Sequence, residues 1–368
     1  MDPARLLRLE GSRRQGRNGS RAGRPPEGAR VVPRTTQTRR VQQRIYADRP
    51  QCVSIVGDPR IGKSSFLDGL AASAEAGDPA PPPGTRFVRL SAAGPLGASP
   101  AAFLGLVLDA LADGADGARL SSVPGSPDAS PRAYASLETK VRELAQAGGR
   151  LILLLDDFDR ITSSPAFPAT FFSFLRSLAN NFPVAYVTTS RQDLQQLCVS
   201  REVEESPFFN IFQNLGLGPL DEAQTRALAA ERASDLGSAL ADWAWFESGG
   251  LPAVAAACCD VARAGKAPGS DEARAALDEV LAPYVQELWA HFEETHRGLL
   301  ARIAAGEAPG ERDARPLRDL GPRRGYLREQ DGRWVLASEA LRRLLALPRG
   351  ADPSSPGLLR RMKRFFGG

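Results

Sequence analysis

The eight residues Gly57 to Ser64, which read Gly-Asp-Pro-Arg-Ile-Gly-Lys-Ser, constrain the fold more than any other part of the chain. They match the spacing Gly-x-x-x-x-Gly-Lys-Ser/Thr, follow the apolar stretch Cys52–Val56 and precede a helical pattern. Glycines let backbone N–H groups curl around a phosphate, and the N-terminus of the next helix adds its positive dipole end. The alternative is a chance glycine-rich turn, which the flanking strand and helix disfavour. The pattern therefore predicts a phosphate-binding loop inside an α/β domain.

We expect the whole loop to contact a bound nucleotide. The predicted contacts are Gly57, Asp58, Pro59, Arg60, Ile61, Gly62, Lys63, Ser64 and Ser65. Among them, Lys63 would reach the β- and γ-phosphates as a catalytic residue, and the Ser64 hydroxyl would ligate Mg²⁺. Only four of the 47 basic residues are lysines, so a lysine in this position stands out.

A second signal is the stretch Leu151–Leu155, which runs directly into Asp156 and Asp157. An apolar strand of this kind is buried and delivers its acids at the carboxyl edge of a parallel sheet, where ligands bind. Asp156 would hold the Mg²⁺ shell, and Asp157 would orient or deprotonate the attacking water. The alternative is a strand end followed by a solvated turn. Asp159 is interpreted as a solvated loop or cap residue.

Between residues 51 and 218, short apolar strands alternate with helical patterns, which indicates a parallel α/β sheet between helices. The expected strands are Cys52–Val56, Arg86–Leu90, Leu151–Leu155 and Val184–Thr188, and the expected helices are Lys63–Ala76, Pro100–Ala112, Pro131–Ala147 and Pro168–Asn180. We therefore expect a three-layer core, with the phosphate-binding loop after its first strand.

The composition changes after residue 218. The stretch 221–264 is Ala-rich and helical with an interruption at residues 249–252, and 282–305 is expected to form one amphipathic helix. Two short apolar runs flank Asp331-Gly332, which is a hairpin signal. Helices followed by a hairpin are typical of a small winged-helix domain. The predicted division is a core at 50–218, a helical lid at 219–278 and a winged-helix domain at 279–346.

The net charge of +4 is unevenly distributed. Residues 1–49 hold thirteen Arg and four Asp/Glu, so 13 − 4 = +9 lies there and 4 − 9 = −5 remains for the rest. Such a segment contains few apolar residues and is predicted to be a disordered basic arm, like the basic tail at 347–368. The alternative is that arm or tail contacts nucleic acid or an anionic membrane surface. No apolar run approaches the ~20 residues of a membrane-spanning helix.

Two further residues can be interpreted as nucleotide contacts only together with these motifs. Arg191 follows the strand Val184–Thr189, where its guanidinium would approach the γ-phosphate or simply be solvated. Pro252 follows Gly250-Leu251, and a proline there is also explained by its preference for the first position of a helix.

Taken in order, the phosphate-binding loop, Asp156-Asp157, Thr189-Ser190-Arg191, Gly250-Leu251-Pro252 and a winged helix resemble the STAND class. These are AAA-like signalling ATPases related to the NACHT and NB-ARC families, and the resemblance spans about residues 50–346. It implies ATP or ADP with Mg²⁺ as cofactors. It also implies that the paired acids bind Mg²⁺ and activate the attacking water, and that Arg191 is a catalytic sensor. It also implies that Gly250 and Pro252 contact the nucleotide from the lid. Effector and repeat-sensor domains typical of the class are not recognised in the sequence.

We therefore expect a slow, cytoplasmic ATPase that acts as a switch in signalling or conflict response. The resemblance implies protein partners or self-assembly in the ATP state. Two other functions stay open at this stage. One is a DNA-binding AAA-type ATPase of the origin-recognition kind, suggested by the basic arm and the Arg-rich segment 312–328. The other is a scaffold that binds nucleotide without hydrolysing it.

Overall fold

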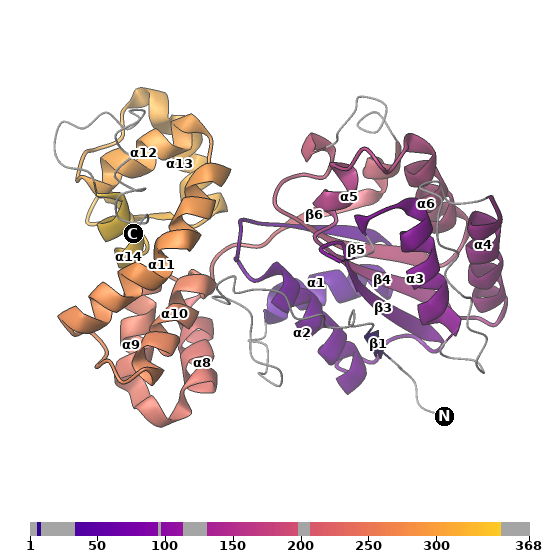
Figure 1. Ribbon diagram of the computed structural model, residues 1–368, viewed down its shortest axis with the longest axis horizontal. Coiled ribbons are helices and arrows are strands. Elements are labelled where there is room, and N and C mark those ends of the chain that lie inside the picture. The colour runs from indigo at the N-terminus through magenta and orange to yellow at the C-terminus, as the bar shows by residue number, and fades with distance from the viewer. Residues whose placement is uncertain (1–5, 9–33, 95–96, 113–130, 198–206, 347–368) are drawn as a thin grey trace. The chain divides into compact units, whose positions relative to one another are not determined.

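The computed structural model describes residues 6–8, 34–94, 97–112, 131–197 and 207–346 (Figure 1). The basic tail and most of the predicted arm therefore lie outside the described residues. Contacts divide the chain into two compact units. In the described part, the first contains 6–8, 34–57 and 63–216, and the second contains 58–62 and 217–346.

The first unit is a parallel sheet between helices, as predicted. Its strands are β1 (Leu6–Arg8), β2 (Cys52–Val56), β3 (Thr85–Ser91), β4 (Arg150–Asp156), β5 (Val184–Ser190) and β6 (Phe212–Gly216). Its helices are α1 (Thr35–Ile45), α2 (Lys63–Ala76), α3 (Pro100–Ala112), α4 (Pro131–Gln146), α5 (Asp159–Thr162) and α6 (Ala169–Asn181). The four predicted strands and four predicted helices are confirmed, three of them with identical bounds.

The sheet order β1-β3-β4-β5-β2-β6 places β2 between β5 and β6. Right-handed crossovers then put α2 on one face, where it packs against β4 and β5, and α3, α4 and α6 on the other. The central strands β4 and β5 are buried almost throughout, which explains their unbroken apolar sequences. All strands are parallel, so the ends of β2, β4 and β5 lie at one edge of the sheet.

The expectation of a flexible arm over residues 1–49 is wrong for its last part. Helix α1 packs against α2 and β2, and its side chains Val41 and Ile45 are fully buried. Gln42 is also buried and donates from Nε2 to Ser73 Oγ on α2 at 2.9 Å. The arginines on the other turns of α1 hid this apolar stripe, because only two apolar residues carry it. Near the N-terminus, β1 adds a short strand beside β3.

The second unit contains helices and one hairpin. They are α8 (Glu222–Arg232), α9 (Gly237–Ser248), α10 (Pro252–Arg263), α11 (Asp271–His291), α12 (Glu294–Ala304), α13 (Ala314–Arg318), β7 (Leu327–Gln330), β8 (Arg333–Leu336) and α14 (Glu339–Leu345). The hairpin predicted around Asp331-Gly332 is confirmed, with positive φ at both turn residues. The single helix expected over 282–305 is instead two, because the chain turns at Phe292, and α11 runs through the predicted boundary at 278–279.

A buried acid holds α9 and α14 together. Glu247 is fully buried near the end of α9, and Arg343 of α14 reaches it with an Nη1–Oε2 distance of 2.6 Å. Arg343 also pairs with Asp278 on α11 at 2.7 Å, so one guanidinium joins three helices. The Ser338 hydroxyl donates to the Glu247 carbonyl oxygen at 2.6 Å. A buried charge of this kind is costly unless it is paired, so the three helices are fixed together. Among the described residues, no helix is both long and apolar enough to cross a bilayer.

Gly249 tests this packing. It ends α9 with φ of 54°, and a Cβ there would overlap the carbonyl oxygen of Ala337. Gly249→Ala should therefore lower the free energy of unfolding by about 3 kcal/mol, from backbone strain and overpacking together. Gly265→Ala is the matched control, because Gly265 also has positive φ but open space around it, and about 1 kcal/mol is expected. Equal losses in chemical denaturation would show that Ala337 does not crowd Gly249.

Candidate nucleotide-binding site

The loop from Gly57 to Ser64 joins β2 to α2 as predicted. A hydrogen bond fixes the start of the loop to strand β5, because Gly57 N donates to Ser190 O at 3.1 Å. The backbone then curls, with φ of 58° at Arg60 and 96° at Gly62. Positive φ at Arg60 was not expected from the sequence, since glycine usually fills such positions.

Lys63 begins α2 and is buried. Its Nζ donates to Gly57 O at 2.7 Å, so the ammonium lies across the mouth of the loop. The first turn of α2 contains Lys63, Ser64 and Ser65, and a helix N-terminus leaves its first N–H groups without intrahelical partners. The lysine charge and these N–H groups together favour an anion at this position.

The two predicted acids share one threonine. The Thr189 hydroxyl on β5 donates to Asp156 Oδ1 at 2.6 Å. The hydroxyl oxygen, Thr189 Oγ1, also accepts a hydrogen bond from Asp157 N at 2.8 Å. Asp156 is buried at the end of β4. Asp157 has a φ of 54°, an unfavourable value for an aspartate that this hydrogen bond helps to hold. Thr189 was part of the strand motif in the sequence, but its bridging role was not predicted.

The surroundings of Asp157 raise the pKa of its side chain. Burial raises the pKa of its carboxyl group, and the nearby carboxylates of Asp156 and Asp159 raise it further. Arg160 and Lys63 act in the opposite direction and only partly compensate. A carboxylate with a raised pKa accepts a proton more readily than an ordinary one, as general base catalysis requires.

Arg191 and Asp159 form an ion pair. Arg191 Nε lies 2.9 Å from Asp159 Oδ2, and the arginine side chain is 54% exposed. The interpretation of Asp159 as a solvated residue is wrong, because only 4% of its side chain is exposed. Burial became possible because Arg191 neutralises the charge.

Arg89 is the residue that sequence reasoning missed. Its guanidinium lies 3.2 Å from Asp156 Oδ2 and also contacts Ser64 O at 3.4 Å. An arginine inside a strand belongs to no recognisable sequence motif, so its position could not be predicted. The sheet register, which pairs Arg89 with Leu154, brings it close to Asp156.

The oxygen donors present suit Mg²⁺. Ser64 offers a hydroxyl and Asp156 a carboxylate, and Mg²⁺ prefers such hard oxygen ligands. Within the described residues, no group of three or more His, Cys, Asp or Glu side chains forms a dedicated metal cage. Mg²⁺ is usually bound by one or two protein oxygens together with phosphates and water.

The middle of the loop, residues 58–62, belongs to the second unit. Asp58 is buried, and Arg324 pairs with it through Nε at 3.0 Å and through Nη2. His291 Nε2 lies 3.1 Å from Asp58 Oδ1. Burial alone would raise the pKa of Asp58, but the hydrogen bonds from His291 and Arg324 lower it to about 2.

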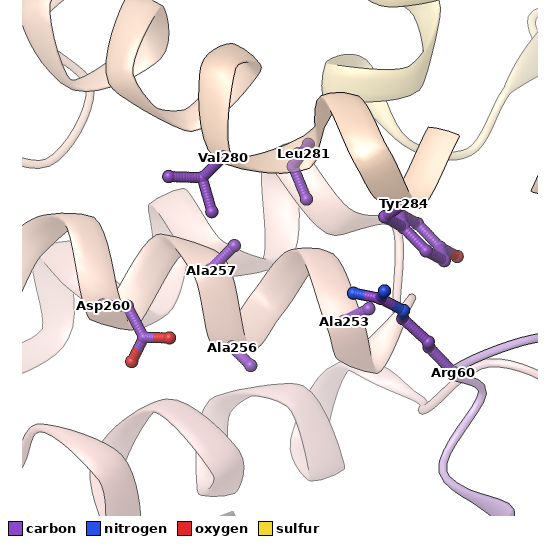
Figure 2. Close-up of a pocket in the computed structure, with 8 residues that line it drawn as sticks. All are labelled: Arg60, Ala253, Ala256, Ala257, Asp260, Val280, Leu281 and Tyr284. Carbon is purple, nitrogen blue, oxygen red and sulfur yellow. The ribbon is translucent and has the colours of Figure 1, made fainter. Parts of the chain in front are cut away.

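Arg60 contacts two residues of helix α11. Its Nε pairs with Glu287 on α11 at 2.9 Å, and its guanidinium lies over the ring of Tyr284 at 6.0 Å. Figure 2 shows the Arg60 side chain in a small pocket lined by α10 and α11. Asp58 and Arg60, predicted as nucleotide contacts, thus pair with other residues of the second unit, to which they belong.

Gly250 and Pro252 lie in a tight turn of the second unit. Gly250 has φ of 88°, and a Cβ there would overlap the carbonyl oxygen of Leu220. Pro252 occupies the first turn of α10, as its helix-start preference predicts. This packing accounts for both residues, and their contact with nucleotide stays a prediction.

Two protein families are similar to parts of this chain. The family described as Novel STAND NTPase 2 matches residues 133–309, and the family described as AAA domain matches residues 46–199. Over these residues the chain is similar to STAND-class and AAA-type P-loop ATPases. The two matches together include the phosphate-binding loop, both acids and Pro252. No curated protein matches the chain.

Solved structures share the fold of this chain. The Walker-type ATPase PABY2304 of Pyrococcus abyssi has a TM-score of 0.56 at 12% identity, covering 86% of this chain and 96% of that one. The ORC2 protein of Aeropyrum pernix, in ADPNP–ADP complexes, has a TM-score of 0.55 at 16% identity, covering 92% and 97%. Both likenesses span the parallel sheet and the helical second unit.

The pKa of Asp58 predicts a pH-dependent contribution to stability. A fall from 3.8 to about 2 corresponds to roughly 2 kcal/mol. Because the pKa is lower in the folded state, this stabilisation is complete above about pH 4 and disappears as the pH falls towards 2. In urea unfolding, Asp58→Asn should therefore be about 2 kcal/mol less stable than wild type at neutral pH, with the difference shrinking in acid. A difference that stays constant with pH would contradict the ion pair.

Proposed function

We propose that this protein is a molecular switch of the STAND type, which binds ATP with Mg²⁺ and hydrolyses it slowly. The observation that carries the proposal is the Thr189 bridge, which holds Asp156 and Asp157 at the sheet edge where the Gly57–Ser64 loop begins. The ADPNP–ADP complexes of the ORC2 protein support adenine nucleotides as the ligand class.

Each residue has a defined task in this proposal. Loop N–H groups and Lys63 bind the phosphates, and Ser64 and Asp156 would hold Mg²⁺, which supplies charge neutralisation on the phosphate oxygens. Asp157 accepts a proton from the attacking water. Its raised pKa and its position next to Asp156 support this assignment over that of a second metal ligand.

Three predicted contacts complete the switch. Arg191 would respond to the γ-phosphate by exchanging Asp159 for a phosphate oxygen, and Gly250 and Pro252 would contact the nucleotide, as the STAND resemblance implies. In our proposal, helices α11 to α13 and the β7–β8 hairpin form the winged-helix domain that changes position with nucleotide state. Signalling through protein partners or self-assembly, in the cytoplasm, completes the proposal.

DNA binding is a second candidate, favoured by one observation. Exposed arginines gather on α13, the hairpin and the turns beside them, at Arg312, Arg315, Arg318, Arg323, Arg328 and Arg333. Such a cluster can neutralise phosphates. Filter binding of random duplex at two salt concentrations tests it. A steep loss of binding with salt supports DNA binding, and no binding at low salt excludes it.

Nucleotide assays on two variants test the main proposal. Lys63→Ala should weaken ATP binding about 30-fold or more, because a charge-assisted hydrogen bond to phosphate is lost. Asp157→Asn should retain nucleotide binding but reduce turnover about 100-fold or more. Lys140→Ala is the control, because Lys140 is exposed on α4 and, in the described part of the chain, pairs with Glu143 one turn away. Unchanged turnover in Asp157→Asn would overturn its role as base, and wild-type-like binding in Lys63→Ala would overturn the assignment of the loop.

A further inference from the structure

Arg89 lies beside both residues that would hold the metal ion. Its strand β3 runs next to β4, and the side chain is only 12% exposed. The guanidinium contacts Asp156 Oδ2 at 3.2 Å and Ser64 O at 3.4 Å. Its Nε also pairs with Asp68 at 3.2 Å, one helical turn beyond Ser64 on α2. One side chain thus ties the N-terminus of α2 to the acid at the end of β4.

This contact leaves Asp156 with two fixed neighbours. Oδ1 accepts from Thr189, and Oδ2 faces Arg89. A carboxylate has about four acceptor positions, so Asp156 can still accept a hydrogen bond from a metal-bound water. Arginine cannot lose its charge in a protein, so a permanent positive charge stands next to the metal position.

We propose that Arg89 is a positioning residue that orients Asp156 and weakens the binding of Mg²⁺, so that nucleotide affinity depends little on the metal. This inference rests on the proposed function, because it concerns the same site. The electrostatic reason is direct: like charges repel, and they do so more strongly where protein rather than water surrounds them. Arg89 also partly neutralises Asp156, the carboxylate that would attract the cation.

Wild-type protein gives a first test. We expect the affinity for fluorescent ADP to change less than about tenfold between excess Mg²⁺ and EDTA, a difference of at most about 1.4 kcal/mol. A gain of a hundredfold or more on adding Mg²⁺ would overturn the proposal without any variant. If wild type binds no ADP under either condition, the proposed function itself fails, which is a distinguishable result.

Variants then separate charge from structure. In Arg89→Gln, which removes the charge, half-saturation by Mg²⁺ at fixed ADP should occur at about tenfold lower metal concentration. Arg89→Lys keeps the charge and should stay close to wild type. Arg86→Gln is the matched control, because Arg86 lies on the same strand and, among the described residues, donates to Leu111 O rather than to Asp156 or Ser64. Thermal unfolding checks that each variant is folded.

The outcomes are decisive in both directions. Tighter Mg²⁺ binding in Arg89→Gln alone supports the proposal. Unchanged or weaker Mg²⁺ binding in Arg89→Gln overturns it, and so does an equal shift in Arg86→Gln. A purely structural role would weaken ADP binding equally with and without the metal, so the metal dependence would not move.

Discussion

The hydroxyl group of Thr189 is the contact on which the candidate site depends. It joins β5 to the end of β4 by donating to Asp156 and accepting from Asp157. The next residue on β5, Ser190, accepts from Gly57 and so fixes the start of the phosphate-binding loop. Two consecutive residues of one buried strand therefore align the loop and the acids. The parallel sheet makes this possible, because the strand ends meet at a single edge.

Charge balance explains much of what surrounds this edge. Asp156 and Asp159 are buried acids, and each has an arginine, Arg89 and Arg191 respectively. Without these partners the cost of burying two carboxylates so close together would be several kcal/mol. Asp157 Oδ2 lies 3.9 Å from Arg160 Nε, and burial together with the carboxylates of Asp156 and Asp159 raises the pKa of Asp157. The same balance that stabilises the site thus leaves one carboxylate suited to accept a proton.

The sequence predicted those elements that are defined by local patterns, such as apolar runs and motifs. The strand Cys52–Val56 and the helix Lys63–Ala76 have identical predicted and observed bounds, because apolar runs and a motif define them. Helix α1 was missed because arginines mask its narrow apolar stripe. Strand β6 was missed because it is a half-exposed edge strand with polar residues. Charge pairs between residues far apart in the sequence, such as Arg324 with Asp58, could not be predicted from local sequence patterns.

In our proposal, the loop and the paired acids form one nucleotide site per chain. Equilibrium dialysis of the full chain against ATP with Mg²⁺, with ADP and GTP as competitors, tests it most directly. We expect one ATP bound per chain, displaced by ADP and not by GTP. If a folded sample shows no saturable ATP binding, the loop and Lys63 do not form a nucleotide site.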